Sequence, residues 1–303
     1  MNETLTILTS PGVYTELVDG LPVKNRAAIA VGDQLWVDHL RIIRARPGDG
    51  SGQLDEPPGS DRTVPIYLGD DLSHIIAYTD KDWRTLWYNP DSSLAPQPIP
   101  AHDGEIVSLA DLGAIPGLLA KPTLTTCLAW MDDWGLPDNI HRHVQLVARL
   151  AYSLGVMLRG HGEPVDPILA HRGGLLHDLD KLHTLDSDQR HGTTAANFLR
   201  TQGHPDLAHI VRGHILQSAL EGHLDQQPWE VRLVFFCDKL VEQDQIVPFD
   251  ERVEALKSRY PAFREVMERA EPTVWGLNDQ ICSILSISSH QNLILRLKEL
   301  QNY

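Results

Sequence analysis

Residues 167–181 read PILAHRGGLLHDLDK, and this stretch decides how the C-terminal half of the chain is interpreted. Pro167 is typical of a first helical position, and the apolar residues after it favour a helix that continues to Leu176. Gly173 and Gly174 lack a side chain, so a neighbouring helix can approach closely there. The pair His177-Asp178 follows at once, which places an imidazole and a carboxylate where this helix ends.

Three other helices predicted around this stretch carry one polar residue each on an apolar stripe. The helices follow Pro137-Asp138, Pro205-Asp206 and Pro228, because proline and aspartate are common at helix starts. Their apolar residues recur at helical spacing, and the residues on the stripes include His143, His214 and Asp238. Further helices are predicted from Pro248, Pro261 and Ser289, so the C-terminal half is interpreted as an all-α bundle.

These polar residues on apolar stripes predict a metal site. A single core histidine is more often a hydrogen-bonded structural residue than a ligand, and that alternative stays open for each one. An unpaired buried carboxylate, however, is costly or takes up a proton. Four helices that each send a histidine or an aspartate into one interior would be stabilised by a cation, and imidazole with carboxylate suits Fe, Mn or Zn.

The order of the motifs resembles the HD-domain metal-dependent phosphohydrolase superfamily over about residues 125–265. The matching elements are HVQLVA (143–148), GLLHDLDK (174–181), HGTTAANFL (191–199), GHPDLAHIVRGH (203–214) and FCDKLV (236–241), with DER (250–252) and RYP (259–261) downstream. An isolated His-Asp pair would carry no weight, whereas these elements occur in order and at compatible spacing.

The resemblance implies the residues of the site. It makes the metal ligands His143, His177, Asp178 and Asp238, with His191 and His214 for a second metal position. Two divalent ions, Fe, Mn or another transition metal, or Mg, would share a bridging hydroxide and hold a phosphoryl group, with Asp178 as the bridging carboxylate. Asp178 and Lys181 are the expected catalytic residues, with Lys181 contacting a substrate phosphate. The alternative for Lys181 is an ordinary surface lysine.

The expected function is hydrolysis of a small phosphate ester or phosphoanhydride, with a nucleotide as the expected substrate. No Gly-Tyr-Pro sequence follows residue 214, and Asp180-Lys181 stands where alarmone hydrolases have a Glu-Asp pair. Both of those subfamilies are therefore disfavoured. An HD-domain di-iron oxygenase and a nucleotide-binding regulatory module remain as alternatives.

The N-terminal part gives a different pattern, and the predicted fold class is α+β. We expect a small β-rich domain of unassigned role at residues 1–110, a connector and first helix at 111–135, and the HD-domain bundle at 136–303. The predicted strands are 6–8, 28–31, 40–43, 64–68, 75–78 and 85–88, because short β-branched runs alternate there with turn residues.

Composition limits the partners. The 303 residues carry 26 Lys+Arg against 41 Asp+Glu, a net charge of −15, so a long nucleic acid is not expected to bind. The cysteines Cys127, Cys237 and Cys282 are far apart, which favours a reducing, cytoplasmic location. The longest apolar stretch, residues 113–131, is interrupted by Pro116, Lys121 and Pro122, so no membrane association is expected. The oligomeric state stays open.

Overall fold

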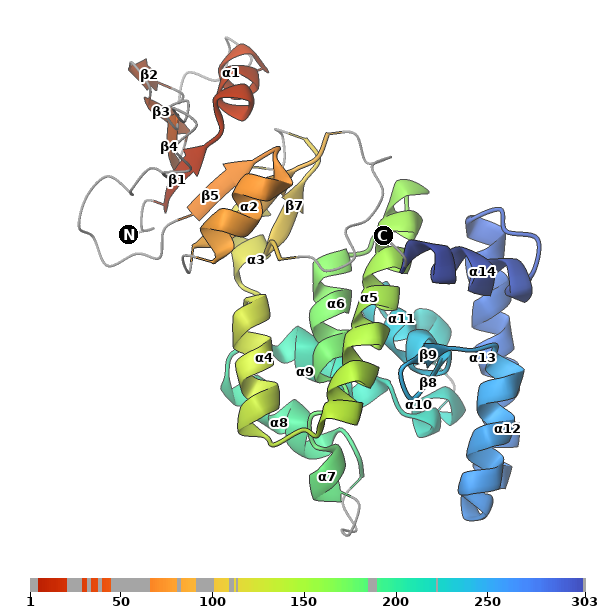
Figure 1. The fold of residues 1–303 in the computed structure, drawn as a ribbon. Helices are drawn as coiled ribbons and strands as arrows, with labels where there is room; N and C mark the ends of the chain where they lie inside the picture. Colours follow the sequence, from red (N-terminus) through yellow and green to blue (C-terminus); the bar gives the residue numbers. More distant parts are fainter. Residues whose placement is uncertain are drawn as a thin grey trace. The chain divides into compact units, whose positions relative to one another are not determined.

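The computed structural model describes residues 5–20, 29–31, 34–37, 40–44, 66–80, 83–90, 101–108, 112, 114–184, 190–221 and 223–301. Residues 28, 64–65 and 110, which belong to predicted strands or to the predicted domain boundary, lie outside these ranges. The described residues fall into two compact units, which meet along the chain at Thr123 and Leu124. The chain is mostly helical, with a small and largely parallel sheet in the first unit (Figure 1).

The first unit contains a seven-stranded sheet in the order β2-β3-β4-β1-β5-β6-β7. The five strands from β4 to β7 in this order run parallel, whereas β2 and β3 pair antiparallel with their neighbours. The strand bounds are β1 Leu5–Thr9, β2 Ile29–Val31, β3 Gln34–Val37, β4 Leu40–Arg44, β5 Ile66–Gly69, β6 Arg84–Tyr88 and β7 Gly104–Ile106. In the described part of this unit they are accompanied by α1 Pro11–Gly20, α2 Leu72–Thr79 and α3 Ile115–Leu119.

Both faces of this sheet are covered. Side chains of a strand alternate between faces, so Ile7 packs in the same cluster as Leu17 of α1, while its neighbour Leu8 packs with Ile75 of α2. A parallel sheet with helices on both faces is an α/β arrangement. The first unit therefore contains the expected sheet, together with helices that the expectation of a β-rich domain did not include.

The predicted strand at residues 75–78 is wrong, because these residues belong to α2. Asp71 begins this helix, since its side chain accepts a hydrogen bond from the Ser73 backbone N–H at 2.8 Å. Ile75 and Tyr78 are the buried residues of the helix, and their spacing of three is helical. A short apolar run is compatible with a strand or a helix, and here the Asp71 cap decides for the helix.

The second unit is a helical bundle in which the predicted helix starts are found. The helices are α4 Leu124–Asp133, α5 Asp138–Gly160, α6 Pro167–Leu176, α7 Lys181–Thr184, α8 Thr193–Thr201, α9 Pro205–Gly213, α10 Leu216–Leu220, α11 Trp229–Asp238, α12 Phe249–Arg259, α13 Arg264–Ile284 and α14 His290–Leu300. Two short 3-10 helices, Leu224–Gln226 and Pro261–Phe263, and a hairpin of β8 Val241–Glu242 and β9 Gln245–Ile246 complete it. Among the described residues, no helix combines the length and the apolar character that crossing a membrane requires.

The packing of α5 against α6 fixes the middle of the bundle, where the two helices lie side by side (Figure 1). A Cβ atom on Gly174 would lie 2.6 Å from the Ala148 Cα and 2.9 Å from its backbone nitrogen. On Gly173 it would lie 2.6 Å from a methyl carbon of Ile210, on α9. The two glycines therefore bring α5 and α9 close to the end of α6, which carries His177 and Asp178.

Candidate metal centre

The six predicted ligands come from five separate segments, and the fold brings all six together. His143 lies on α5, and His177 and Asp178 directly follow α6. His191 lies just before α8, His214 directly follows α9, and Asp238 is the last residue of α11. They form two groups, His143 with His177 and Asp238, and Asp178 with His191 and His214. In each group one ligand atom per residue lies within 4.8 Å of the others.

Asp178 lies between the two groups. Its Oδ1 is 2.8 Å from the His191 Nε2 and 3.8 Å from the His214 Nε2. Its Oδ2 is 3.7 Å from the His177 Nε2 and 3.9 Å from the His143 Nε2. Each oxygen of this one carboxylate therefore faces a different group.

Asp238 completes the first group. Its Oδ1 is 3.1 Å from the His143 Nε2 and 3.7 Å from the His177 Nε2. The two imidazole rings lie with their centroids 5.5 Å apart. One carboxylate oxygen and two imidazole nitrogens thus converge on one small volume, which is the donor set of a borderline-soft divalent ion.

Backbone carbonyls orient the histidines. The Nδ1–H of His177 donates to the Gly174 carbonyl at 2.7 Å, and that of His214 donates to the Val211 carbonyl at 2.6 Å. His143 donates its Nδ1–H to the Gln243 carbonyl, in the turn between β8 and β9, at 3.1 Å. A histidine that donates through Nδ1 presents the lone pair of Nε2, which is the ligand form.

The His177 Nε2 tests whether a metal fits here. Its side chain is fully buried, and the Nε2 has no hydrogen-bond partner in the described part of the chain. A buried polar atom without a partner costs about 1–3 kcal/mol. A cation held between His143, His177 and Asp238 would satisfy this atom, so the residues fit a metal ion.

Two lysines balance the carboxylates. Lys181 forms an ion pair with the Asp178 Oδ2, and the Lys239 Nζ lies 2.6 Å from the Asp238 Oδ2. Burial alone would raise the pKa of Asp178, but Lys181 and the nearby histidines hold that pKa well below its usual range. Burial would likewise raise the pKa of Asp238, but Lys239, His143 and His177 together hold that pKa well below its usual range. Both carboxylates are therefore ionised and able to bind a cation.

Lys239 was missed by the sequence reasoning, although it directly follows the predicted ligand Asp238. It is 5 % exposed and also donates to the His214 backbone carbonyl at 3.0 Å. A lysine at a helix end next to a carboxylate is by itself an ordinary feature. Its position between α11 and the end of α9 depends on tertiary packing, which the local sequence does not contain.

Asp180 was also missed as a partner of the site. It is fully buried and accepts the Gly192 and Ala195 backbone N–H groups, each at 3.0 Å. Its Oδ1 also lies 2.9 Å from the His191 Nδ1. Burial alone would lower the pKa of His191, but its hydrogen bonds to the Asp178 and Asp180 carboxylates raise this pKa to about 9. Asp180 therefore orients His191, as a carboxylate behind a metal-binding histidine does.

Comparison with known proteins gives the family. Residues 140–242, which include all six residues of the two groups, match the family model of the HD domain. The chain is also similar to "Uncharacterized protein MJ0778" of Methanocaldococcus jannaschii, with 27% identity over 163 residues, 49% of this chain and 90% of that protein. No solved structure gives a significant match. The resemblance found in the sequence is confirmed, and the helical half of this chain contains an HD domain at residues 140–242.

Proposed function

We propose that this chain hydrolyses a small phosphate ester or phosphoanhydride, with a nucleotide as the first substrate class to test. The observation that carries the proposal is the position of Asp178, whose Oδ1 is 2.8 Å from the His191 Nε2 while its Oδ2 is 3.7 Å from the His177 Nε2. A carboxylate in this position can bridge two ions. The proposed centre is dinuclear.

The two groups divide the ligands. His143, His177 and Asp238 would hold one ion, His191 and His214 would hold the other, and Asp178 would touch both. Divalent ions in such a pair supply Lewis acidity toward a phosphoryl oxygen and a water nucleophile at neutral pH. A mixed set of imidazole and carboxylate ligands favours Fe, Mn or Zn, whereas Mg prefers oxygen ligands alone.

Lys181 has the properties of a substrate-binding residue. Its side chain is 40% exposed, whereas Asp178, with which it pairs, is 5% exposed. The ammonium group therefore lies at the boundary between the ligands and solvent. The Asp178 carboxylate raises the pKa of Lys181 against the effect of burial, so the group stays charged at neutral pH. A fixed positive charge beside the ions suits an anionic phosphate and stabilises the charge that develops during its transfer.

The test combines a metal count with an activity screen. The full chain is purified without chelator, its metals are counted by elemental analysis, and phosphate release is measured from a panel of nucleotides and phosphodiesters. The variant His143→Ala removes one ligand, and His141→Ala is its matched control. His141 lies on the same helix but pairs with the surface residue Asp132, at 3.6 Å.

About two metals per chain with phosphate release, both reduced in His143→Ala and retained in His141→Ala, would support the proposal. Two irons with oxygen consumption and no phosphate release would replace it with an oxygenase. Nucleotide binding without turnover in the metal-loaded protein would replace it with a regulatory module. A metal-free protein that takes up no added divalent ion would refute the metal centre itself.

A further inference from the structure

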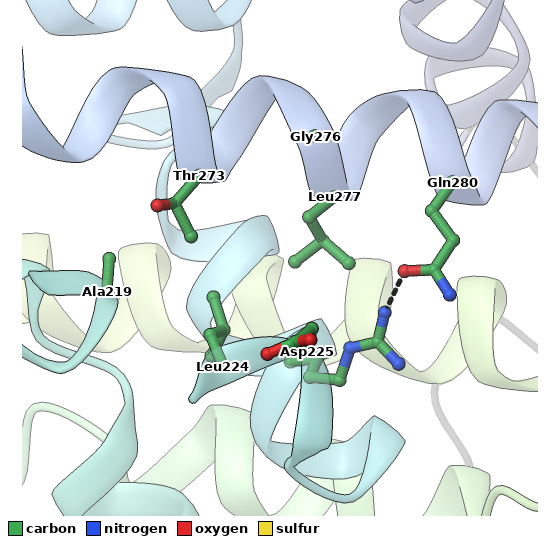
Figure 2. A pocket seen from close by; sticks show the side chains of 8 residues that line it. Ala219, Leu224, Asp225, Thr273, Gly276, Leu277 and Gln280 are labelled. Carbon is green, nitrogen blue, oxygen red and sulfur yellow. Dashed lines mark hydrogen bonds between the residues drawn. The ribbon is translucent and has the colours of Figure 1, made fainter. Parts of the chain in front are cut away.

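A cavity lies in the helical unit, between α13 and the segment around α10 and the 3-10 helix 224–226. Its volume is about 390 Å³, within the range of small-molecule sites. Figure 2 shows Thr273, Gly276, Leu277 and Gln280 of α13 facing Ala219, Leu224 and Asp225. None of the residues that line it belongs to the two metal-binding groups. The cavity is therefore distinct from the metal centre.

One wall of the cavity carries a buried arginine. Arg232 of α11 is 5% exposed, and its guanidinium carbon lies 3.7 Å from the centroid of the Trp229 ring. Its Nη2 donates to the Gln280 Oε1, as the dashed line in Figure 2 marks. Its Nε is buried without a hydrogen-bond partner, and Arg232 forms no ion pair with any residue that the structure describes. Buried arginines are usually paired with an acid, and among the described residues Arg232 has a neutral acceptor in Gln280 but no carboxylate partner.

Nearby acids do not supply that acceptor. Asp225 and Glu163 act on the guanidinium only from beyond ion-pair distance and support its charge against the effect of burial. The Glu163 carboxylate accepts instead from the Trp229 Nε1–H at 2.7 Å. Asp225 is exposed at the cavity. The guanidinium is thus held by Trp229 and Gln280, and the cavity in front of it is the remaining place for an anion.

The rest of the lining limits what that anion is. Leu224, Leu277 and the bare backbone of Gly276 form an apolar surface, and a Cβ on Gly276 would have no atom within 4 Å. The planar guanidinium of one arginine matches one carboxylate group. The negative charge of the nearby Asp225 repels a doubly charged phosphate more strongly than a singly charged carboxylate. We propose that this cavity binds a small organic carboxylate, with its carboxylate on Arg232 and its apolar body against Leu224, Leu277 and Gly276.

The test uses calorimetric titration of the full chain with isovalerate, hexanoate and benzoate. The corresponding amides are the neutral controls, and inorganic phosphate is the competing anion. Titrations are made with the protein as purified and again after chelation. Gly276→Leu places a side chain in the cavity, and Gly160→Leu is its control, because Gly160 is also an exposed helical glycine with open space around it.

Arg232→Gln and Asp225→Asn test the charges. The expected result is saturable binding of a carboxylate and not of its amide, unchanged by chelation. Gly276→Leu and Arg232→Gln are expected to weaken it at least tenfold, Gly160→Leu to leave it unchanged, and Asp225→Asn to tighten it a few-fold.

The proposal would be overturned by no saturable binding of any of the three carboxylates, by an affinity unaffected by Gly276→Leu, or by phosphate binding more tightly than the carboxylates. Loss of binding on chelation alone would assign the carboxylate to the metal centre and would equally overturn it. Because chelated protein is sufficient for this test, failure of the proposed phosphohydrolase activity would not affect the outcome.

Discussion

His191 makes metal binding depend on pH. In the metal-free protein its imidazole lies between two carboxylates, 2.8 Å from the Asp178 Oδ1 and 2.9 Å from the Asp180 Oδ1. These contacts raise its pKa to about 9 against the effect of burial. A metal ion requires the deprotonated Nε2, so binding to the group of Asp178, His191 and His214 must displace a proton. We expect metal affinity to rise with pH across the neutral range.

The size of the effect on metal affinity follows from the difference between the pKa of His191 and the pH of the assay. With a pKa of about 9, His191 is neutral in about 1% of molecules at pH 7, so the apparent affinity at that pH is about 100-fold below its limit. This corresponds to about 2.7 kcal/mol. His214 adds no proton, because burial and the neighbouring His177 and His191 hold its pKa well below the ordinary value. One proton per ion is therefore released from this group, and affinity rises about tenfold per pH unit.

The assay is a competition titration of Mn²⁺ against a chelating dye, from about pH 6.5 to about pH 8.5, with the dye calibrated at each pH. Calorimetry in buffers of different ionisation enthalpy counts the protons directly. The variant Asp180→Asn keeps an acceptor for the His191 Nδ1–H but removes one negative charge. In this variant the rise of metal affinity with pH should therefore level off at a lower pH than in the wild type. An affinity that is independent of pH, without proton release, would show that His191 is not a ligand or is not protonated as described.

Three further predictions concern stability and substrate binding. In metal-free protein the raised pKa of His191 stabilises the fold fully below about pH 6.5, and this stabilisation is lost as pH rises through about 9. The expected loss in the free energy of unfolding, on the order of 3 kcal/mol, is measurable by urea unfolding. An unfolding free energy that does not change over this pH window would contradict the prediction. Gly174→Ala should destabilise by about 1–3 kcal/mol, because its Cβ meets the Ala148 backbone at 2.6 Å; Gly160→Ala, with open space around it, should be neutral, and equal unfolding midpoints would refute the close-packing argument. Lys181→Met should lower kcat/KM for a phosphate substrate at least tenfold with unchanged metal content in elemental analysis, whereas wild-type kinetics would make it an ordinary surface lysine.

Local sequence predicted the helices of the bundle well, because helix starts and apolar stripes are properties of neighbouring residues. Proline at or just before the first turn marks α5, α6, α9 and α11. His143 and Asp238 lie three or four residues from apolar residues of their own helices, and this spacing alone predicted that they face the interior. The same local reasoning failed at residues 75–78, where a short apolar run is compatible with a strand or a helix and the Asp71 cap decided.

His191 shows where local sequence stops being sufficient. It precedes α8 outside any periodic pattern, so only the family resemblance indicated it, and its place beside Asp178 depends on how α6 and α8 are held.

The sequence by itself determined the helical half, its family and the residue types of the candidate centre. Tertiary structure alone decided the parallel order of the sheet, the contacts of Asp180 and Lys239, and the cavity beside Arg232. The physical reason is the range of the interactions. Caps and periodicity act over a few residues, whereas Lys239 contacts a carbonyl 25 residues away and Arg232 contacts a side chain 48 residues away. Such contacts are set by how whole helices pack, and a single sequence does not state that packing.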